Sequence, residues 1–175
     1  GLDRVRAAVE GKSADMSTAD VTFDPLIREP HASWALALNY KLHIEETGLT
    51  TSKEYPQIFL RMPICQVGHD EALWAPQLDI AEAYDYEGEL AVIIGKPGRH
   101  IPQEAAFDYV AGYTIINEGS VRDWLRRGTQ NSPGKNFYRS GAIGPWMVTA
   151  DEIPDPTALR IVTRVDGEVR QDGGT

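Results

Sequence analysis

One stretch carries most of the structural information in this chain, YDYEGELAVIIG at residues 84–95. From Tyr84 to Ile94 it is typical of one long β-strand. Side chains alternate between the two faces of a strand, so one face carries the set Asp85, Glu87, Glu89, Ala91 and Ile93. Carboxylates and core-type residues therefore share a face of this predicted strand.

These carboxylates lie in an acidic region that has no counterions of its own. The stretch from Met62 to Gly95 contains no Lys or Arg and carries seven acidic residues, Asp70, Glu71, Asp79, Glu82, Asp85, Glu87 and Glu89. Groups outside the stretch must therefore neutralise part of this charge.

Glu87 and Glu89 give the sharpest local signal, together with Glu118 at the end of a strand predicted over residues 111–117. Three carboxylates that converge in a partly buried site repel one another unless a divalent cation lies among them. Hard oxygen ligands with room for water favour Mg²⁺ or Mn²⁺. The alternative is structural: Glu87 and Glu89 face solvent on an edge strand, and Glu118 caps the following helix.

A second signal is the pair His43 and Glu46, which lie at positions i and i+3 of one helical turn directly after a strand. A carboxylate at this spacing can orient an imidazole, and an oriented histidine can take a proton from water near neutral pH. The alternative is an exposed pair on a polar helix. The sequence has no Cys and His spacing of the zinc type, so zinc is not expected.

The third signal is a set of cations in an otherwise acidic chain, Arg122, Arg126, Arg127 and Lys135. Arginine suits carboxylate recognition, and lysine suits a developing oxyanion. Arg126 and Arg127 are interpreted as charges that complement a helix C-terminus, which leaves Arg122 and Lys135 as candidate functional groups. Gly134-Lys135 lacks the upstream glycine and the following Ser or Thr of a phosphate-binding loop, so ATP is not implied.

Around these residues the pattern predicts short elements of both kinds. A helix is expected from Ser120, with Asp123 as its capping-box partner, and Asp166-Gly167 is expected to form a hairpin turn. The other predicted helices cover residues 2–10 and a segment that opens at Pro102, and the other predicted strands cover residues 34–38, 56–61, 145–149, 159–165 and 168–170. We expect an N-terminal docking segment over residues 1–32 and a core domain over residues 33–175.

Composition narrows the classes of partner. The chain has 175 residues, enough for a hydrophobic core, and 17 Lys and Arg against 26 Asp and Glu give a formal charge of −9. This charge disfavours nucleic acid and anionic membranes as partners. No apolar run approaches the roughly 18 residues of a membrane helix. Cys65 is the single cysteine, which is consistent with the expected cytoplasmic location.

An ordered series of motifs resembles the fumarylacetoacetate hydrolase family. The series starts with ALNYKLHIEETG at residues 37–48, YDYEGELAVIIG at 84–95 and DYVAGYT at 108–114. It continues with SVRDW at residues 120–124, GKNF at 134–137, GPW at 144–146 and VDGEVRQD at 165–172. The order of these motifs from Ala37 to the last residue is more specific than any one of them, and it favours the acylpyruvase and fumarylpyruvate hydrolase branch.

The resemblance implies an α+β fold that is mostly β, a mixed β-roll or sandwich with short helices. It also implies a Mg²⁺ or Mn²⁺ enzyme acting on a small-molecule 2-keto acid, and a homodimer. Carried over by position, Glu87, Glu89 and Glu118 would bind the metal, and His43 and Glu46 would activate water. Lys135 would bind the substrate oxygen or the enolate, and the substrate would also contact Arg122, Asn39 and Tyr40.

The chain departs from the family pattern in three places. Glu118 stands where the family usually has Asp, and Ala37 replaces a common Gly. The family pattern continues into further strands that close the active site, so the domain is expected to be incomplete at its C-terminus. Substrate specificity is expected to lie in the loops around residues 47–53 and 129–140.

Three functions follow as hypotheses. The preferred one is hydrolysis of a C–C bond in a 2,4-diketo acid of the acylpyruvate, fumarylpyruvate or fumarylacetoacetate type, with a role in aromatic catabolism. The second keeps the same metal site and has the chain decarboxylate oxaloacetate-like acids or isomerise 2-hydroxymuconate-like acids, because all three reactions use an enolate. The third is a non-catalytic fragment or binding module.

Overall fold

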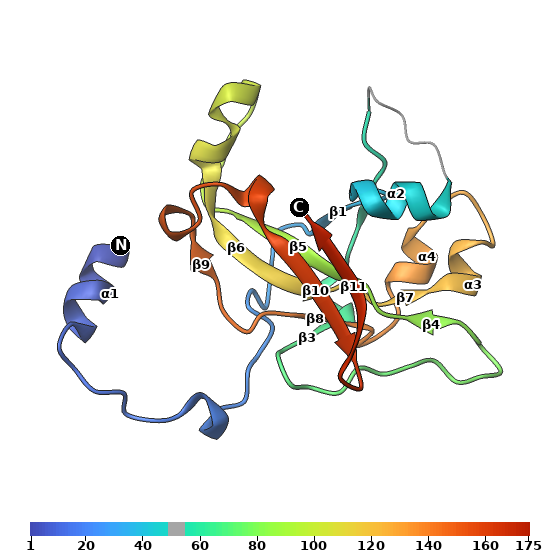
Figure 1. Cartoon of the computed structure of the whole chain (residues 1–175), viewed down its shortest axis with the longest axis horizontal. Coiled ribbons are helices and arrows are strands. Elements are labelled where there is room, and N and C mark those ends of the chain that lie inside the picture. Colours follow the sequence, from blue (N-terminus) through green and yellow to red (C-terminus); the bar gives the residue numbers. More distant parts are fainter. Residues whose placement is uncertain (49–54) are drawn as a thin grey trace.

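The computed structural model describes residues 1–48 and 55–175. They form a mixed α+β fold with mostly strands and a few short helices (Figure 1). The strands are β1 (Trp34–Leu36), β2 (Ile58–Leu60), β3 (Gln66–Val67), β4 (Tyr84–Asp85), β5 (Gly88–Ile94), β6 (Val110–Asn117), β7 (Ser120–Val121), β8 (Gly141–Ile143), β9 (Val148–Thr149), β10 (Arg160–Val165) and β11 (Glu168–Gly174). The α-helices are α1 (Leu2–Val9), α2 (Lys41–Thr47), α3 (Arg122–Leu125) and α4 (Ser132–Lys135). Short 3₁₀ helices cover Thr18–Asp20, Pro63–Cys65, Gln103–Tyr109, Ala150–Glu152 and Pro156–Ala158.

The main sheet has the strand order β3-β8-β6-β5, and β9 also pairs with β6. Its longest pairing is antiparallel, between β5 and β6, and runs from Gly88 opposite Asn117 to Ile94 opposite Val110. The β10–β11 hairpin lies across this sheet, on the side from which Figure 1 is viewed. Its turn has the predicted residues, and both Asp166 (φ 51°) and Gly167 (φ 83°) adopt positive φ, as a tight hairpin turn requires.

The prediction of one continuous strand over residues 84–94 is wrong. The strand is interrupted at Tyr86 and Glu87, so that β4 pairs with β7 while β5 pairs with β6. At this point a side chain takes the place of a backbone acceptor in the strand pairing. Asn117 Oδ1 accepts a hydrogen bond from Glu87 N at 3.1 Å. The interruption turns the Glu87 side chain toward β7 and α4.

Two further elements differ from the prediction. Ser120 does not start a helix: it lies in β7, α3 begins at Arg122, and no side-chain hydrogen bond caps that helix. The capping box with Asp123 is therefore wrong, and Ser120 Oγ donates to Glu87 Oε1 instead. The strand expected over residues 145–149 is confined to Val148–Thr149.

The best-buried part of the molecule is polar as well as apolar. The buried apolar side chains are Phe59, Cys65, Val67, Ala81, Tyr113 and Val121. The buried polar and charged side chains are Arg61, Thr114, Glu118, Ser120, Lys135 and Ser140. Because charged groups are rarely buried without partners, this polar centre marks the place where a functional site is expected.

The N-terminal segment lies along one side of the molecule (Figure 1). It contacts the rest of the chain through an Arg6–Asp151 ion pair of 2.7 Å and through Phe23, whose ring meets that of His69 at 5.4 Å. Its expected role as a docking segment stays a prediction. In the part of the chain that the structure describes, no helix is long and apolar enough to cross a membrane.

Candidate active site

A cavity of about 260 Å³ lies between α2, the interruption of β4 and β5, and β11. The described residues that line it include most of the predicted site, namely Tyr40, His43, Glu46, Glu87, Glu89 and Arg122. Lys135 and Glu118 lie behind Glu87, where Lys135 contacts both carboxylates. Asn39 is exposed and lines neither of the two cavities described here, so its expected contact with substrate stays a prediction.

Glu87 is the centre of the charged network. Its carboxylate accepts hydrogen bonds from Lys135 Nζ at 2.6 Å and Ser120 Oγ at 2.8 Å, and it pairs with Arg122 Nη1 at 2.5 Å. Burial alone would raise the pKa of Glu87, but the charges of Lys135 and Arg122 outweigh it, and the pKa lies below its ordinary value. Glu87 is therefore a carboxylate at neutral pH.

Glu118 is almost completely buried, with 1% of its surface exposed. Arg61, itself 2% exposed, places Nε 3.0 Å from Glu118 Oε2, and Lys135 Nζ lies 3.7 Å from Oε1. The Arg61 guanidinium compensates the charge of Glu118 but donates no hydrogen bond to it, since neither oxygen of Glu118 has a hydrogen-bond partner. Burial raises the pKa of Glu118, and Arg61 and Lys135 only partly offset that effect.

Glu89 is the carboxyl group of the site whose pKa is raised furthest into the neutral range. Burial, followed by the charges of Glu87 and Glu118, raises its pKa to about 8. Glu118 is buried and α3 has no side-chain cap, and the Glu87 side chain is 18% exposed and paired with Lys135, so these two positions disagree with the structural alternative. Metal binding by the three carboxylates stays a prediction.

Backbone contacts fix these side chains relative to one another. Glu118 N donates to Glu87 O at 2.8 Å, which joins the interruption in β4–β5 to the end of β6. Gly119 allows the backbone after Glu118 to pass close to Ser140, because a Cβ at this position would lie 1.8 Å from Ser140 O. Asn136, next to Lys135, bonds to Met62 N at 2.7 Å and to Leu60 O at 2.9 Å, and so holds α4 against β2.

Helix α2 forms the opposite wall of the cavity. It begins after Tyr40, whose hydroxyl accepts a hydrogen bond from Leu90 N at 2.9 Å, and it ends at Gly48 in the left-handed conformation. His43 and Glu46 both face the cavity from this helix. No hydrogen bond joins their side chains in the described structure, so the orientation of His43 by Glu46 stays a prediction.

Arg122 also has partners within the protein. Its Nε and Nη2 both lie 2.9 Å from Asp85 Oδ2, while Nη1 contacts Glu87. In this arrangement Arg122 fixes the position of Glu87. Its expected contact with the substrate carboxylate stays a prediction.

The residues fit a divalent cation, although among the described residues no three acidic, His or Cys side chains are gathered closely enough to hold one as they stand. Both oxygens of Glu118 are buried without a hydrogen-bond donor, and Glu89 is forced to keep its proton. A cation among Glu87, Glu89 and Glu118 would give the Glu118 oxygens a positive partner. It would also lower the pKa of Glu89 and favour its ionised form. Oxygen donors of this kind suit Mg²⁺ or Mn²⁺.

Sequence reasoning missed Arg61, Ser120 and Asp85 as parts of this network. Arg61 follows apolar residues in β2 and has no local feature that marks it as buried. The pattern predicts Ser120 as a helix cap and places Asp85 on the acidic face of one long strand. Neither expectation points to Glu87 or Arg122 as a partner. Of the two loops expected to set specificity, residues 49–53 lie outside the described residues.

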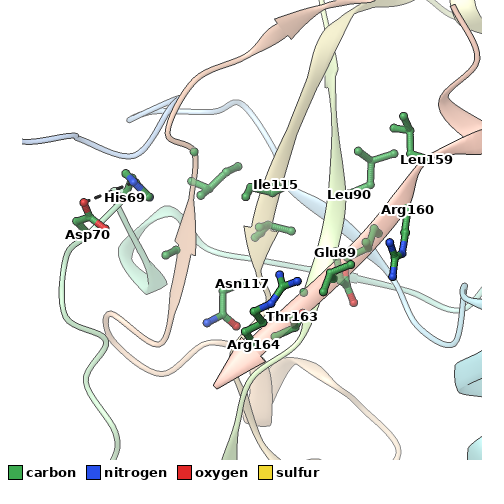
Figure 2. Close-up of a pocket in the computed structure, with 17 residues that line it drawn as sticks. His69, Asp70, Glu89, Leu90, Ile115, Asn117, Leu159, Arg160, Thr163 and Arg164 are labelled. Atoms are coloured by element: carbon green, nitrogen blue, oxygen red, sulfur yellow. Dashed lines mark ion pairs between the residues drawn. The ribbon is translucent and has the colours of Figure 1, made fainter. Parts of the chain in front are cut away.

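A larger cavity of about 640 Å³ lies between the main sheet and β10. Figure 2 shows Leu90 and Ile115 on neighbouring strands of the sheet, with Leu159 and Arg160 at the start of β10. Glu89 borders both cavities. The walls of the larger cavity are mainly apolar, although Glu89, Asp70, Arg160 and Arg164 also line it.

Comparison with known proteins gives one family. Residues 32–175 match the family described as Fumarylacetoacetate (FAA) hydrolase C-terminal. A Staphylococcus aureus (strain USA300) protein without a characterised function is 38% identical over 180 residues, which cover 99% of this chain and 59% of that protein. The chain thus spans about three fifths of the length of the curated relatives it matches.

Two solved structures are similar over most of the chain. Fumarylacetoacetate hydrolase from Exiguobacterium antarcticum is 32% identical, with a TM-score of 0.75 over 97% of this chain and 63% of that protein. The 5-carboxymethyl-2-hydroxymuconate delta-isomerase from Mycobacterium smegmatis is 31% identical, with a TM-score of 0.71 over 86% of this chain and 54% of that protein. The same architecture therefore occurs in proteins named for a hydrolase and for an isomerase.

Proposed function

Because this chain belongs to the fumarylacetoacetate hydrolase family, we propose that it carries the active site of a Mg²⁺- or Mn²⁺-dependent hydrolase that cleaves a C–C bond in a 2,4-diketo acid. Acylpyruvates and fumarylpyruvate are the substrates of the expected type. The observation that supports this most is the cluster of Glu87, Glu89 and Glu118 around Lys135, in a cavity whose opposite wall carries His43.

The chain's own residues supply most of the chemistry. A divalent cation held by Glu87, Glu89 and Glu118 would polarise the 2-keto acid and stabilise negative charge on it. His43 takes a proton from water, and the water oxygen adds to the far carbonyl carbon of the substrate. The bond between that carbon and C3 then breaks, and its electron pair forms the enolate of pyruvate, which takes up a proton.

Lys135 stabilises the negative charge that develops on the substrate oxygen. Its ammonium group is buried and fixed between Glu87 and Glu118, so it needs little reorganisation to act. The products are pyruvate and a carboxylic acid.

The test is the substitution His43→Ala. We expect it to abolish hydrolysis of an acylpyruvate, since no water is then activated. His100→Ala is the matched control, because His100 is an exposed loop residue that lines neither cavity. Unchanged turnover in His43→Ala would reject the hydrolytic assignment.

A second candidate is isomerisation of a 2-hydroxymuconate-like acid. The similarity to the Mycobacterium smegmatis delta-isomerase favours it, and the same cluster of carboxylates and Lys135 would stabilise the enolate. Product analysis separates the reactions: hydrolysis gives pyruvate and a carboxylic acid, decarboxylation gives CO₂, and isomerisation gives a shifted double bond without loss of carbon.

A further inference from the structure

The smaller cavity is lined by an arginine, Arg170, that the proposed chemistry does not use. Among the described residues that line it, the basic side chains besides His43 are Arg122 and Arg170. Arg122 is held by Asp85 and Glu87. Arg170, on β11, is therefore the lining cation that no buried carboxylate engages.

The backbone of β11 beside Arg170 is held in place by Gln171, while the Arg170 side chain itself is exposed. Gln171 Nε2 donates to Gly88 O at 2.9 Å, and Gly88 N donates to Gln171 Oε1 at 3.2 Å. Thr163 Oγ1 also donates to Gln171 Oε1, at 2.7 Å. Because Gly88 lies between Glu87 and Glu89, these bonds attach β11 to the start of β5, next to two of the predicted metal ligands.

The present partner of Arg170 is weak. Its Nη2 pairs with Glu168 Oε2 at 2.7 Å, and the two side chains are 52% and 70% exposed. Exposed ion pairs of this kind contribute little to stability, since solvent screens them and both side chains lose conformational freedom. The guanidinium can therefore exchange Glu168 for a ligand carboxylate at little cost.

We propose that Arg170 binds a second carboxylate of the substrate, remote from the 2-keto acid group, and so selects dicarboxylic over monocarboxylic 2-keto acids. Guanidinium binds carboxylate through two parallel hydrogen bonds, which gives geometric selectivity as well as attraction. The keto acid lies at the Glu87–Glu89 end of the cavity and the second carboxylate at β11. This assignment of substrate class rests on the proposed function for the position of the keto acid.

The test measures binding of two probes that share one 2-keto acid group. In the presence of Mg²⁺, calorimetric titration with 2-oxoglutarate and 2-oxobutanoate compares a diacid with a monoacid. We expect the protein to bind the diacid about ten- to hundredfold more tightly, as for a hydrogen bond to a charged group. Arg170→Ala should reduce this ratio to near one, and Arg170→Lys should give an intermediate ratio. The matched control is Arg164→Ala, an exposed arginine of the same hairpin that lines the larger cavity and not the smaller.

Two results would overturn the proposal: no preference for the diacid in the unsubstituted protein, or a preference that survives Arg170→Ala. Loss of the preference in Arg164→Ala to the same extent would also contradict it. The proposed function fails separately, through the absence of cleavage of any 2,4-diketo acid. A diacid preference that depends on Arg170 in a protein without hydrolase activity would keep the inference and reject the function.

Discussion

At the scale of single residues, the site depends on charges that are buried together. Arg61 and Glu118 are 2% and 1% exposed. They form an ion pair of 3.0 Å in which each neutralises the charge of the other. Removing one partner of a buried pair leaves an uncompensated charge, which costs more than the pair itself contributes. Arg61 is therefore a structural support of the predicted metal ligand Glu118.

This pair yields a stability prediction. Arg61→Met should lower the free energy of unfolding by about 3–5 kcal/mol. The double substitution Arg61→Met with Glu118→Gln should recover most of the loss, because no buried carboxylate is then left unpaired. Urea unfolding of the single variant, the double variant and the parent protein measures the effect, and equal destabilisation in the single and double variants would contradict it.

Glu89 gives a pH dependence. Its pKa is about 8 in the folded protein, against 4.5 for an ordinary glutamate, so the folded state binds the proton more tightly than the unfolded chain. The resulting stabilisation is complete below about pH 4.5 and is lost progressively as the pH rises toward 8. In the presence of EDTA, the unsubstituted protein should lose stability from pH 5 to 8 more steeply than Glu89→Gln. Parallel stability curves for the two proteins would contradict the raised pKa.

The sequence identified individual residues better than it identified their partners. Spacing marks Glu87, Glu89, Glu118 and Lys135 as candidates, the family resemblance assigns their roles, and the structure places Lys135 in contact with Glu87 and Glu118. Alternation along β2 places Phe59 and Arg61 on the buried face and Ile58 and Leu60 on the exposed face. Sequence reasoning misses Arg61 because an arginine is rarely buried and its partner Glu118 is distant in the chain. A partner that is distant in sequence leaves no trace in local periodicity.

At the scale of elements, the site depends on how strands are interrupted and joined. Periodicity correctly predicted the β10–β11 hairpin and most of β6, whose residues follow local rules. Periodicity wrongly predicts β4 and β5 as one strand. The break between them depends on the hydrogen bond from Glu87 N to the Asn117 side chain, a tertiary contact that periodicity does not contain. Sequence patterns therefore located the elements but not the break that directs Glu87 into the site.

The attachment of β11 to β5 is the element-scale prediction. Gln171→Leu removes both hydrogen bonds to Gly88 and should destabilise the protein by about 1–3 kcal/mol. Amide hydrogen exchange in β11 should accelerate more than in β6. Val169→Ala serves as the control, since Val169 is a half-exposed residue of the same strand. Equal exchange rates in β11 of the two variants would show that Gln171 does not hold the hairpin.

At the scale of the whole molecule, the chain exposes more surface than its mass requires. Its accessible area is 12,844 Å², whereas a compact monomer of 19.4 kDa exposes about 8,500 Å². Part of the excess is an apolar face of β5 and β6 that includes Val92, Ile94 and Ile115, which are 49%, 65% and 60% exposed. The excess is larger than the roughly 800 Å² that each partner buries in a standard interface.

The family resemblance implies a homodimer, and we propose this face as its interface. Light scattering at micromolar concentration should give a mass of twice 19.4 kDa. Ile94→Lys combined with Ile115→Lys should shift the protein to a monomer, because charges would be buried on both sides of the interface. A monomeric mass for the unsubstituted protein would contradict the expectation.

The central claim is that this site breaks a C–C bond with the help of a divalent cation. The most direct measurement is the ultraviolet absorbance of an enolised acylpyruvate mixed with the protein, once with Mg²⁺ and once with EDTA. The account predicts that the absorbance falls with Mg²⁺, yielding pyruvate, and stays constant with EDTA. A fall of the same rate in EDTA, or no fall under either condition, would contradict it.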